Sequence, residues 1–164
     1  MPFNATDIVG GTQELNDGNR IPKIGLGTAE NRDQDSITNT MHASLKAGYR
    51  LIDTAEHYSN EEEIGNALKE NLPKVGLKRD DIFITTKVQI RDKDPNWTEK
   101  SIKQSLEKLR TDYLDMVLVH YPRDRQEGKD EAYEVNKKGR KETWQRLEGL
   151  KGPGTHILNF TKFY

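Results

Sequence analysis

Residues 49–68 read YRLIDTAEHYSNEEEIGNAL and contain one complete strand–loop–helix unit. Tyr49–Asp53 is a short apolar run that predicts a buried strand. Apolar residues then return at the spacing of one helical face (Ile64, Ala67 and Leu68). Ser59 and Glu62 predict a capping box, and the acidic triplet 61–63 would lie at the positive end of the helix dipole. This stretch therefore predicts a strand that leads into a helix.

Upstream of this stretch, the same pattern occurs once more. Ile24–Thr28 predicts a strand, and residues 35–47 predict a helix whose apolar residues recur every four positions (Ile37, Met41 and Leu45). Gly48 follows where a left-handed C-terminal cap is expected. Before the strand, the run Asn16-Asp17-Gly18 predicts the turn of a β-hairpin.

Downstream, strand and helix patterns continue to alternate. Ile82–Val88 and Tyr113–His120 predict strands, and between them Thr98 is expected to cap a helix with one apolar face (Ile102, Leu106 and Leu109). The charged segment Arg123–Lys138 predicts a surface loop. A helix over Arg140–Leu150 and a fifth strand over Ile157–Phe160 complete the pattern. Such alternation predicts an α/β fold with a parallel sheet covered by helices.

Composition excludes several classes of protein. The chain has 164 residues, with 26 basic and 27 acidic side chains, and it has no cysteine. Disulfides, a thiolate nucleophile and cysteine-type zinc sites are therefore excluded. No stretch approaches about 18 consecutive apolar residues, and the N-terminus lacks the pattern of a secretory signal. The interspersed charges argue against a nucleic-acid surface. We therefore expect a cytoplasmic protein with no membrane or nucleic-acid partner and no metal.

Polar side chains occur where the predicted strands end. Asp53, Lys87 and His120 lie at or near the ends of three successive strands, and Tyr58 follows in the loop after the first of them. Parallel α/β sheets carry their active sites at this edge. Each residue taken alone also has a purely structural interpretation. The aspartate could cap a turn, the tyrosine could be a packing residue, and the histidine could be a hydrogen-bonded residue of the core. Taken together on one edge, the four residues favour a functional site.

Four segments in the same order resemble the signature segments of the aldo-keto reductase family: IPKIGLGT, LIDTAEHYSNEEEIGNAL, DIFITTKV and LRTDYLDMVLVHYP. The resemblance covers residues 15–149, and residues 150–164 form a divergent tail. It implies that residues 1–164 form a single partial (β/α)8 TIM-barrel domain with an N-terminal β-hairpin closing its bottom. It also implies NADPH-dependent reduction of aldehydes and ketones, small-molecule carbonyl substrates.

The resemblance places the family's catalytic tetrad on Asp53, Tyr58, Lys87 and His120. A hydride that reaches a carbonyl carbon leaves an alkoxide, which needs a proton donor and a positive field. Tyr58 would supply the proton, Lys87 would stabilise the resulting phenolate, and Asp53 would keep the lysine charged. His120 would orient the substrate oxygen. The resemblance further implies a cofactor site and a substrate pocket at this edge (Gly27, Thr28, Asp53 and Asn159 for the cofactor, and Tyr58, His120 and Tyr121 for the substrate).

The chain also departs from the family pattern. Ala29 replaces a common tryptophan, and Leu158 replaces a serine next to Asn159. A complete barrel needs roughly 250 residues, so strands six to eight and most of the cofactor site are expected to be missing. The sheet would then have open edges that favour self-association. Three hypotheses follow: a reductase active only when the missing half is supplied, an inactive binding or regulatory module, and a non-functional fragment.

Overall fold

The computed structural model describes residues 8–90, 94, 96–121, 132–150 and 157–161. The first two strands of the described residues form an antiparallel hairpin, β1 (Thr12–Glu14) and β2 (Arg20–Pro22). Its turn includes Gly18 at a φ of 83°, and the backbone N–H of Asn19 donates to Asp17 Oδ1 at 3.1 Å. The predicted hairpin turn is confirmed.

The second sheet has five parallel strands in sequential order. They are β3 (Gly25–Gly27), β4 (Leu51–Asp53), β5 (Phe83–Val88), β6 (Leu114–Val119) and β7 (Ile157–Thr161). The register pairs Gly27 with Asp53 and Asp53 with Thr85, so the ends of β3 and β4 are level with each other. All five predicted strands are confirmed, with ends that differ by one or two residues.

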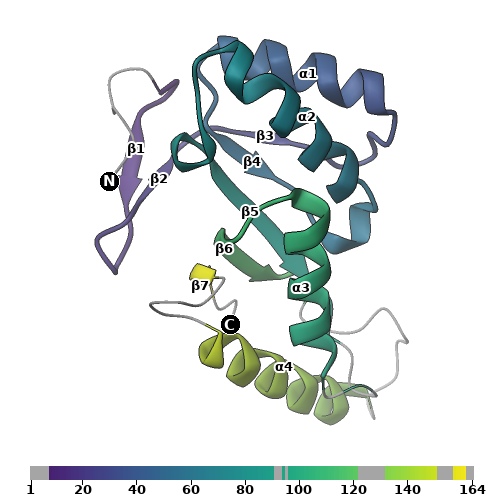
Figure 1. The fold of residues 1–164 in the computed structure, drawn as a ribbon. Helices are drawn as coiled ribbons and strands as arrows, with labels where there is room; N and C mark the ends of the chain where they lie inside the picture. Colours follow the sequence, from purple (N-terminus) through teal and green to yellow (C-terminus); the bar gives the residue numbers. More distant parts are fainter. Residues whose placement is uncertain (1–7, 91–93, 95, 122–131, 151–156, 162–164) are drawn as a thin grey trace.

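In the described part of the chain, four helices lie on one side of this sheet (Figure 1). They are α1 (Gln34–Lys46), α2 (Glu61–Lys74), α3 (Trp97–Leu109) and α4 (Ala132–Gly149), and two short 3₁₀ turns are η2 (Glu56–Tyr58) and η3 (Arg79–Asp81). The main core lies between helices and sheet, where Ile52 and Ile84 of the strands pack with Ile64 of α2 and Ile102 of α3. Sequential parallel strands with helices outside form an incomplete (β/α)8 barrel, as predicted.

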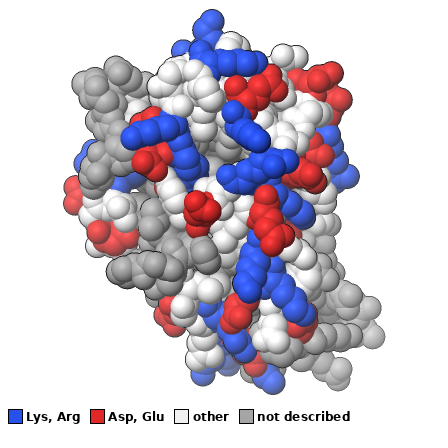
Figure 2. All heavy atoms as spheres, in the orientation of Figure 1, with Lys and Arg blue, Asp and Glu red and all other residues white. Residues whose placement is uncertain are grey.

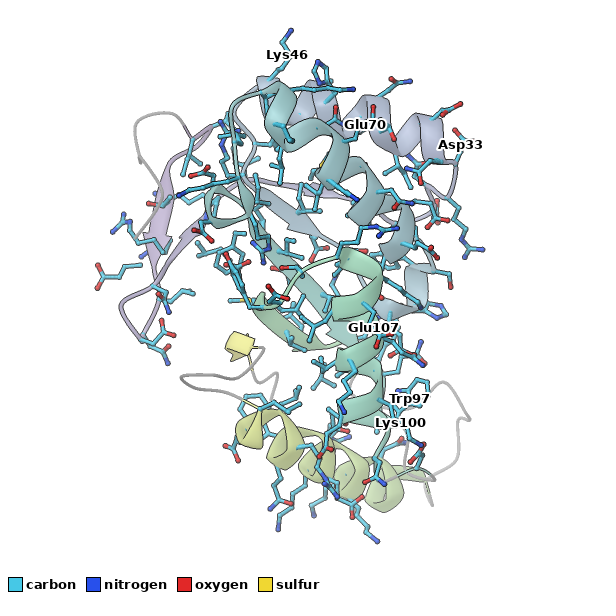
Figure 3. All side chains as sticks on the ribbon, in the orientation of Figure 1. Asp33, Lys46, Glu70, Trp97, Lys100 and Glu107 are labelled. Atoms are coloured by element: carbon cyan, nitrogen blue, oxygen red, sulfur yellow. The ribbon has the colours of Figure 1, made fainter. Side chains whose placement is uncertain are left out.

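Helix α1 follows its sequence pattern closely. Asp33 caps its first turn by accepting a hydrogen bond from the backbone N–H of Ser36 at 2.8 Å. Asp33 and Lys46 lie at opposite ends of the helix, which suits the helix dipole (Figure 3). The predicted apolar face is buried (Ile37, Met41 and Leu45), and Gly48 has a φ of 89° just past the helix.

Two predicted helix starts are wrong. Ser59 has a left-handed backbone with a φ of 56° and ends η2, while Asn60 takes the N-cap position of α2, so the predicted capping box with Glu62 is absent. Thr98 lies inside the first turn of α3 and is buried, because the N-cap position falls on Asn96. Before α2, the Asn60 side chain is bonded to the loop after β3 through the carbonyl oxygens of Thr28 and Asn31, rather than to the first turn of its own helix.

The predicted surface loop over 123–138 is wrong in its last part, because α4 begins at Ala132. Among the residues of this helix whose burial the structure describes, Asn136, Gly139, Thr143 and Leu147 are buried. Their spacing is helical, but Leu147 is the only large apolar residue of these four, so hydropathy gives no signal for the first half of the helix. Residues 122–131 lie outside the described part of the chain.

The surface over α2 and α3 carries Lys and Arg side chains interspersed with Asp and Glu (Figure 2). This face therefore has no large field of one sign, in line with the predicted charge mixing. Among the helices in the described ranges, none has the length and apolar character needed to cross a membrane.

Candidate active site

The four predicted tetrad residues come together at the carboxyl edge of the sheet. Asp53 is the last residue of β4, Lys87 lies near the end of β5, and His120 directly follows β6. Tyr58 is the last residue of η2, the short turn that follows β4. Strand order and register bring these ends together because β4, β5 and β6 are neighbours and parallel.

Lys87 is the centre of this arrangement. Its Nζ donates to Asp53 Oδ2 at 2.6 Å, to the backbone oxygen of Thr54 at 3.0 Å and to Tyr58 Oη at 3.2 Å. The lysine side chain is 13% exposed, whereas the aspartate side chain is 37% exposed. Three acceptors therefore use all three ammonium protons of a mostly buried lysine. The ammonium is held within hydrogen-bond distance of the phenol oxygen.

His120, which follows β6, lies next to the ring of Tyr58. Their rings meet edge to face, with centroids 5.5 Å apart and an interplanar angle of 82°. The His120 ring also stacks on the ring of Tyr121, with centroids 4.4 Å apart. Tyr121 is 40% exposed, and the ring of His57 lies 6.0 Å from that of His120. The rings of Tyr58, His57 and Tyr121 thus all lie close to the ring of His120 at this edge of the sheet.

The residues predicted to bind the cofactor differ in their surroundings and in their hydrogen bonds. Thr28 is tied to Asp53, because its backbone N–H and its Oγ1 both donate to the Asp53 carbonyl oxygen at 3.1 Å. Gly27 is exposed, and a Cβ there would meet no atom within 4 Å. Asn159 lies in β7, paired with Met116, but its side chain lies outside the described part of the chain.

Sequence reasoning missed Asn60, a fully buried amide that joins three segments. Its Nδ2 donates to the backbone oxygens of Thr28 and Asn31, both at 2.7 Å, and its Oδ1 accepts from Thr54 Oγ1 at 3.2 Å. This side chain holds the loop after β3 against the loop after β4. The one available signal was its place before the acidic triplet, since Asn is a preferred N-cap residue.

The backbone around Tyr58 is also supported from outside. Arg32 Nε donates to the Tyr58 carbonyl oxygen at 3.1 Å, and the Tyr58 N–H donates to the Ala55 carbonyl oxygen at 3.0 Å. Together with Asn60, these contacts define the path of the chain from β4 into α2. The site is therefore built from a lysine on a strand and a tyrosine on a well-anchored turn.

Known proteins resemble this chain in both sequence and structure. A glyoxal reductase from Bacillus subtilis is 37% identical over 150 residues, which cover 92% of this chain and 47% of that protein. The solved structure of an aldose reductase from Schistosoma japonicum matches with a TM-score of 0.75 and 31% identity, over 91% of this chain and 51% of the other. An aldo/keto reductase from Brucella melitensis matches with a TM-score of 0.73 and 35% identity, over 96% and 54%.

The chain thus spans about half the length of the curated relatives it matches. The sequence model of the aldo/keto reductase family matches residues 23–155. This range contains β3 to β6 and all four helices, together with the lysine, tyrosine, aspartate and histidine of the site. On the family match, the identities and the shared fold, this chain belongs to the aldo/keto reductase family.

Proposed function

We propose that this chain supplies the proton-transfer half of an NAD(P)H-dependent reductase site that converts aldehydes or ketones to alcohols. The observation that carries the proposal is the position of Lys87 Nζ, which contacts Asp53 Oδ2 and Tyr58 Oη at the same time. A phenol that gives up its proton needs a nearby positive charge, and this lysine provides it.

Each residue has a separate part in the proposed reaction. Tyr58 Oη donates a proton to the carbonyl oxygen of the substrate as that oxygen becomes negative. Lys87 stabilises the phenolate that remains, and Asp53 keeps the ammonium charged and oriented. His120, whose ring borders that of Tyr58, donates a hydrogen bond that orients the same carbonyl oxygen. Tyr121 forms an apolar wall for the rest of the substrate.

The residues at this edge fit the reacting end of a nicotinamide cofactor. Gly27 leaves open space beside the end of β4, because no atom lies within 4 Å of a Cβ built there. We propose that Gly27, Thr28, Asp53 and Asn159 hold the cofactor. When bound, NAD(P)H would supply the hydride for the carbonyl carbon. The preference for NADPH over NADH rests on the family resemblance.

The proposal is tested by following the absorbance of the reduced cofactor after the chain is mixed with NADPH and benzaldehyde. Tyr58→Phe removes only the donated proton and is expected to lower kcat by about 10²- to 10⁴-fold. Tyr49→Phe changes a tyrosine two residues before β4; it is the matched control and should keep the wild-type rate. A wild-type rate no higher than that of Tyr58→Phe, together with no binding of NADPH, would overturn the proposal and favour the non-catalytic hypotheses.

Self-association remains a second part of the proposal. Within the described sheet, β3 and β7 are each paired on one side only. Unpaired strand edges favour pairing with another chain. Light scattering coupled to size-exclusion chromatography measures the oligomeric state directly. A single monomer peak across a wide range of chain concentration would contradict this part.

A further inference from the structure

A buried carboxylate that the proposed reaction does not use lies close to the tyrosine turn. Glu61 is the first residue of α2 and is 2% exposed. Its Oε1 accepts from Thr86 Oγ1 at 2.8 Å, and its Oε2 accepts from Ser105 Oγ at 3.1 Å. Both donors are themselves buried. Burial raises the pKa of the Glu61 carboxyl, although both hydrogen bonds oppose that rise.

The hydrogen bond between Glu61 and Thr86 joins the same two segments of the chain as the hydrogen bond between Tyr58 and Lys87. Glu61 lies three residues after Tyr58, and Thr86 directly precedes Lys87. The two hydrogen bonds therefore close a ring of six residues, 58–61 and 86–87. Thr86 and Lys87 point to opposite faces of β5, because successive side chains alternate along a strand. One bond lies on the helix side of the sheet and the other lies at the site.

We propose that Glu61 is a positioning residue that sets the separation of Tyr58 and Lys87 through Thr86. This inference rests on the proposed reductase function. The ring is small, so loss of the bond on the helix side removes one of the contacts that hold the tyrosine turn in place relative to β5, and the turn can shift. Since a displacement of about 1 Å at a reacting group can lower the rate about 10²-fold, the effect is expected on kcat rather than on substrate binding.

The second bond to Glu61 provides a matched control. Ser105 belongs to α3 and lies outside the six-residue ring, although its hydroxyl also binds the Glu61 carboxylate. When Ser105 is replaced, α3 keeps another contact to the same turn, because Ser101 Oγ donates to Glu56 Oε2 at 2.8 Å. Thr86→Val and Ser105→Ala thus each remove one hydroxyl donor from one carboxylate, but only Thr86→Val opens the ring.

The experiment compares these two variants with the wild-type chain in the NADPH and benzaldehyde assay. Thr86→Val is expected to lower kcat by about 10- to 10²-fold with KM unchanged, and Ser105→Ala to stay within about twofold. Hydrogen exchange gives a readout that does not need activity. The N–H groups of Tyr58 and Ser59, which donate within the turn, should exchange faster in Thr86→Val than in Ser105→Ala.

A second pair of variants covers the case in which Thr86→Val fails to fold. Glu61→Gln keeps an acceptor for Thr86 and should retain kcat, whereas Glu61→Ala should lose it. Glu62→Ala, an exposed neighbour in the same helical turn, is the control.

Equal effects of Thr86→Val and Ser105→Ala on kcat and on exchange would overturn the inference. If the wild-type chain has neither turnover nor NADPH binding but the exchange difference is present, the proposed function fails and the positioning contact stands.

Discussion

Gly65 offers the sharpest test of how the helices pack. It is buried in α2, and its nearest neighbours are Lys108 and Leu109 at the C-terminal end of α3. A Cβ at this position would lie 2.2 Å from the carbonyl oxygen of Lys108 and 2.9 Å from the Cα of Leu109. These are backbone atoms, so a side-chain rotation cannot relieve the contact. Gly65→Ala therefore requires the two helices to move apart.

Two opposing free energies decide the effect of Gly65→Ala on stability. Alanine favours a helix interior over glycine by about 1 kcal/mol. Overpacking a close contact costs about 1–3 kcal/mol, and a contact of 2.2 Å with backbone belongs at the upper end. We therefore expect a net loss of about 2 kcal/mol in the free energy of unfolding. Helix propensity alone predicts the opposite sign.

Urea and thermal unfolding, followed by far-ultraviolet circular dichroism, measure this difference. A loss of about 2 kcal/mol lowers the Tm of a chain of this size by about 4–8 °C. Gly149→Ala is the control, because Gly149 lies at the end of α4 with no atom within 4 Å of a Cβ. It should be neutral or stabilising by up to about 1 kcal/mol. A Gly65→Ala variant as stable as the wild type would refute the close contact between α2 and α3.

Three further predictions concern buried and half-buried polar groups. Arg79→Met removes the 2.6 Å partner of the buried Asp115 carboxylate and should cost about 3–5 kcal/mol in urea unfolding; a loss below about 1 kcal/mol would contradict this. Burial raises the pKa of Tyr113 from 10.0 to about 12, so the stability it contributes is present below pH 10 and lost as the pH rises through about 12. Phenolate absorbance should show this late ionisation, and Tyr113→Phe should abolish it. Burial also raises the pKa of Glu61 above 4.5, so its contribution to stability is present below pH 4.5 and lost as the pH rises through the folded-state pKa. Glu61→Gln should therefore melt at a higher temperature than the wild type at neutral pH, with a difference that vanishes on acidification; a constant difference would argue against this ionisation.

Much of the fold could be predicted because its signals are local. The spacing of Ile37, Met41 and Leu45 indicates the buried face of α1, and Gly48 indicates its end. The short β-branched run of β5 predicts a strand without reference to any neighbour. The parallel order follows from the alternation of such runs with helices. These features depend on residues that are close together in the chain.

The start of α4 and the caps of α2 and α3 could not be predicted in the same way. The buried face of α4 includes Asn136 and Thr143, which become core residues only because other elements cover them. Asn60 uses its side chain to bind the carbonyl oxygens of Thr28 and Asn31 rather than the first turn of its own helix. Tertiary contacts of this kind override the local preference of a residue.

By itself, the sequence determined the order of strands and helices and the edge at which Asp53, Lys87 and His120 lie. Strand ends follow from apolar runs, and parallel strands place their carboxyl ends together. Only the tertiary structure decided which atoms meet: the three acceptors of the lysine ammonium, the ring closed by Glu61 and the close approach at Gly65. Such contacts join residues far apart in the chain, so they depend on strand register and helix packing, which no local pattern contains.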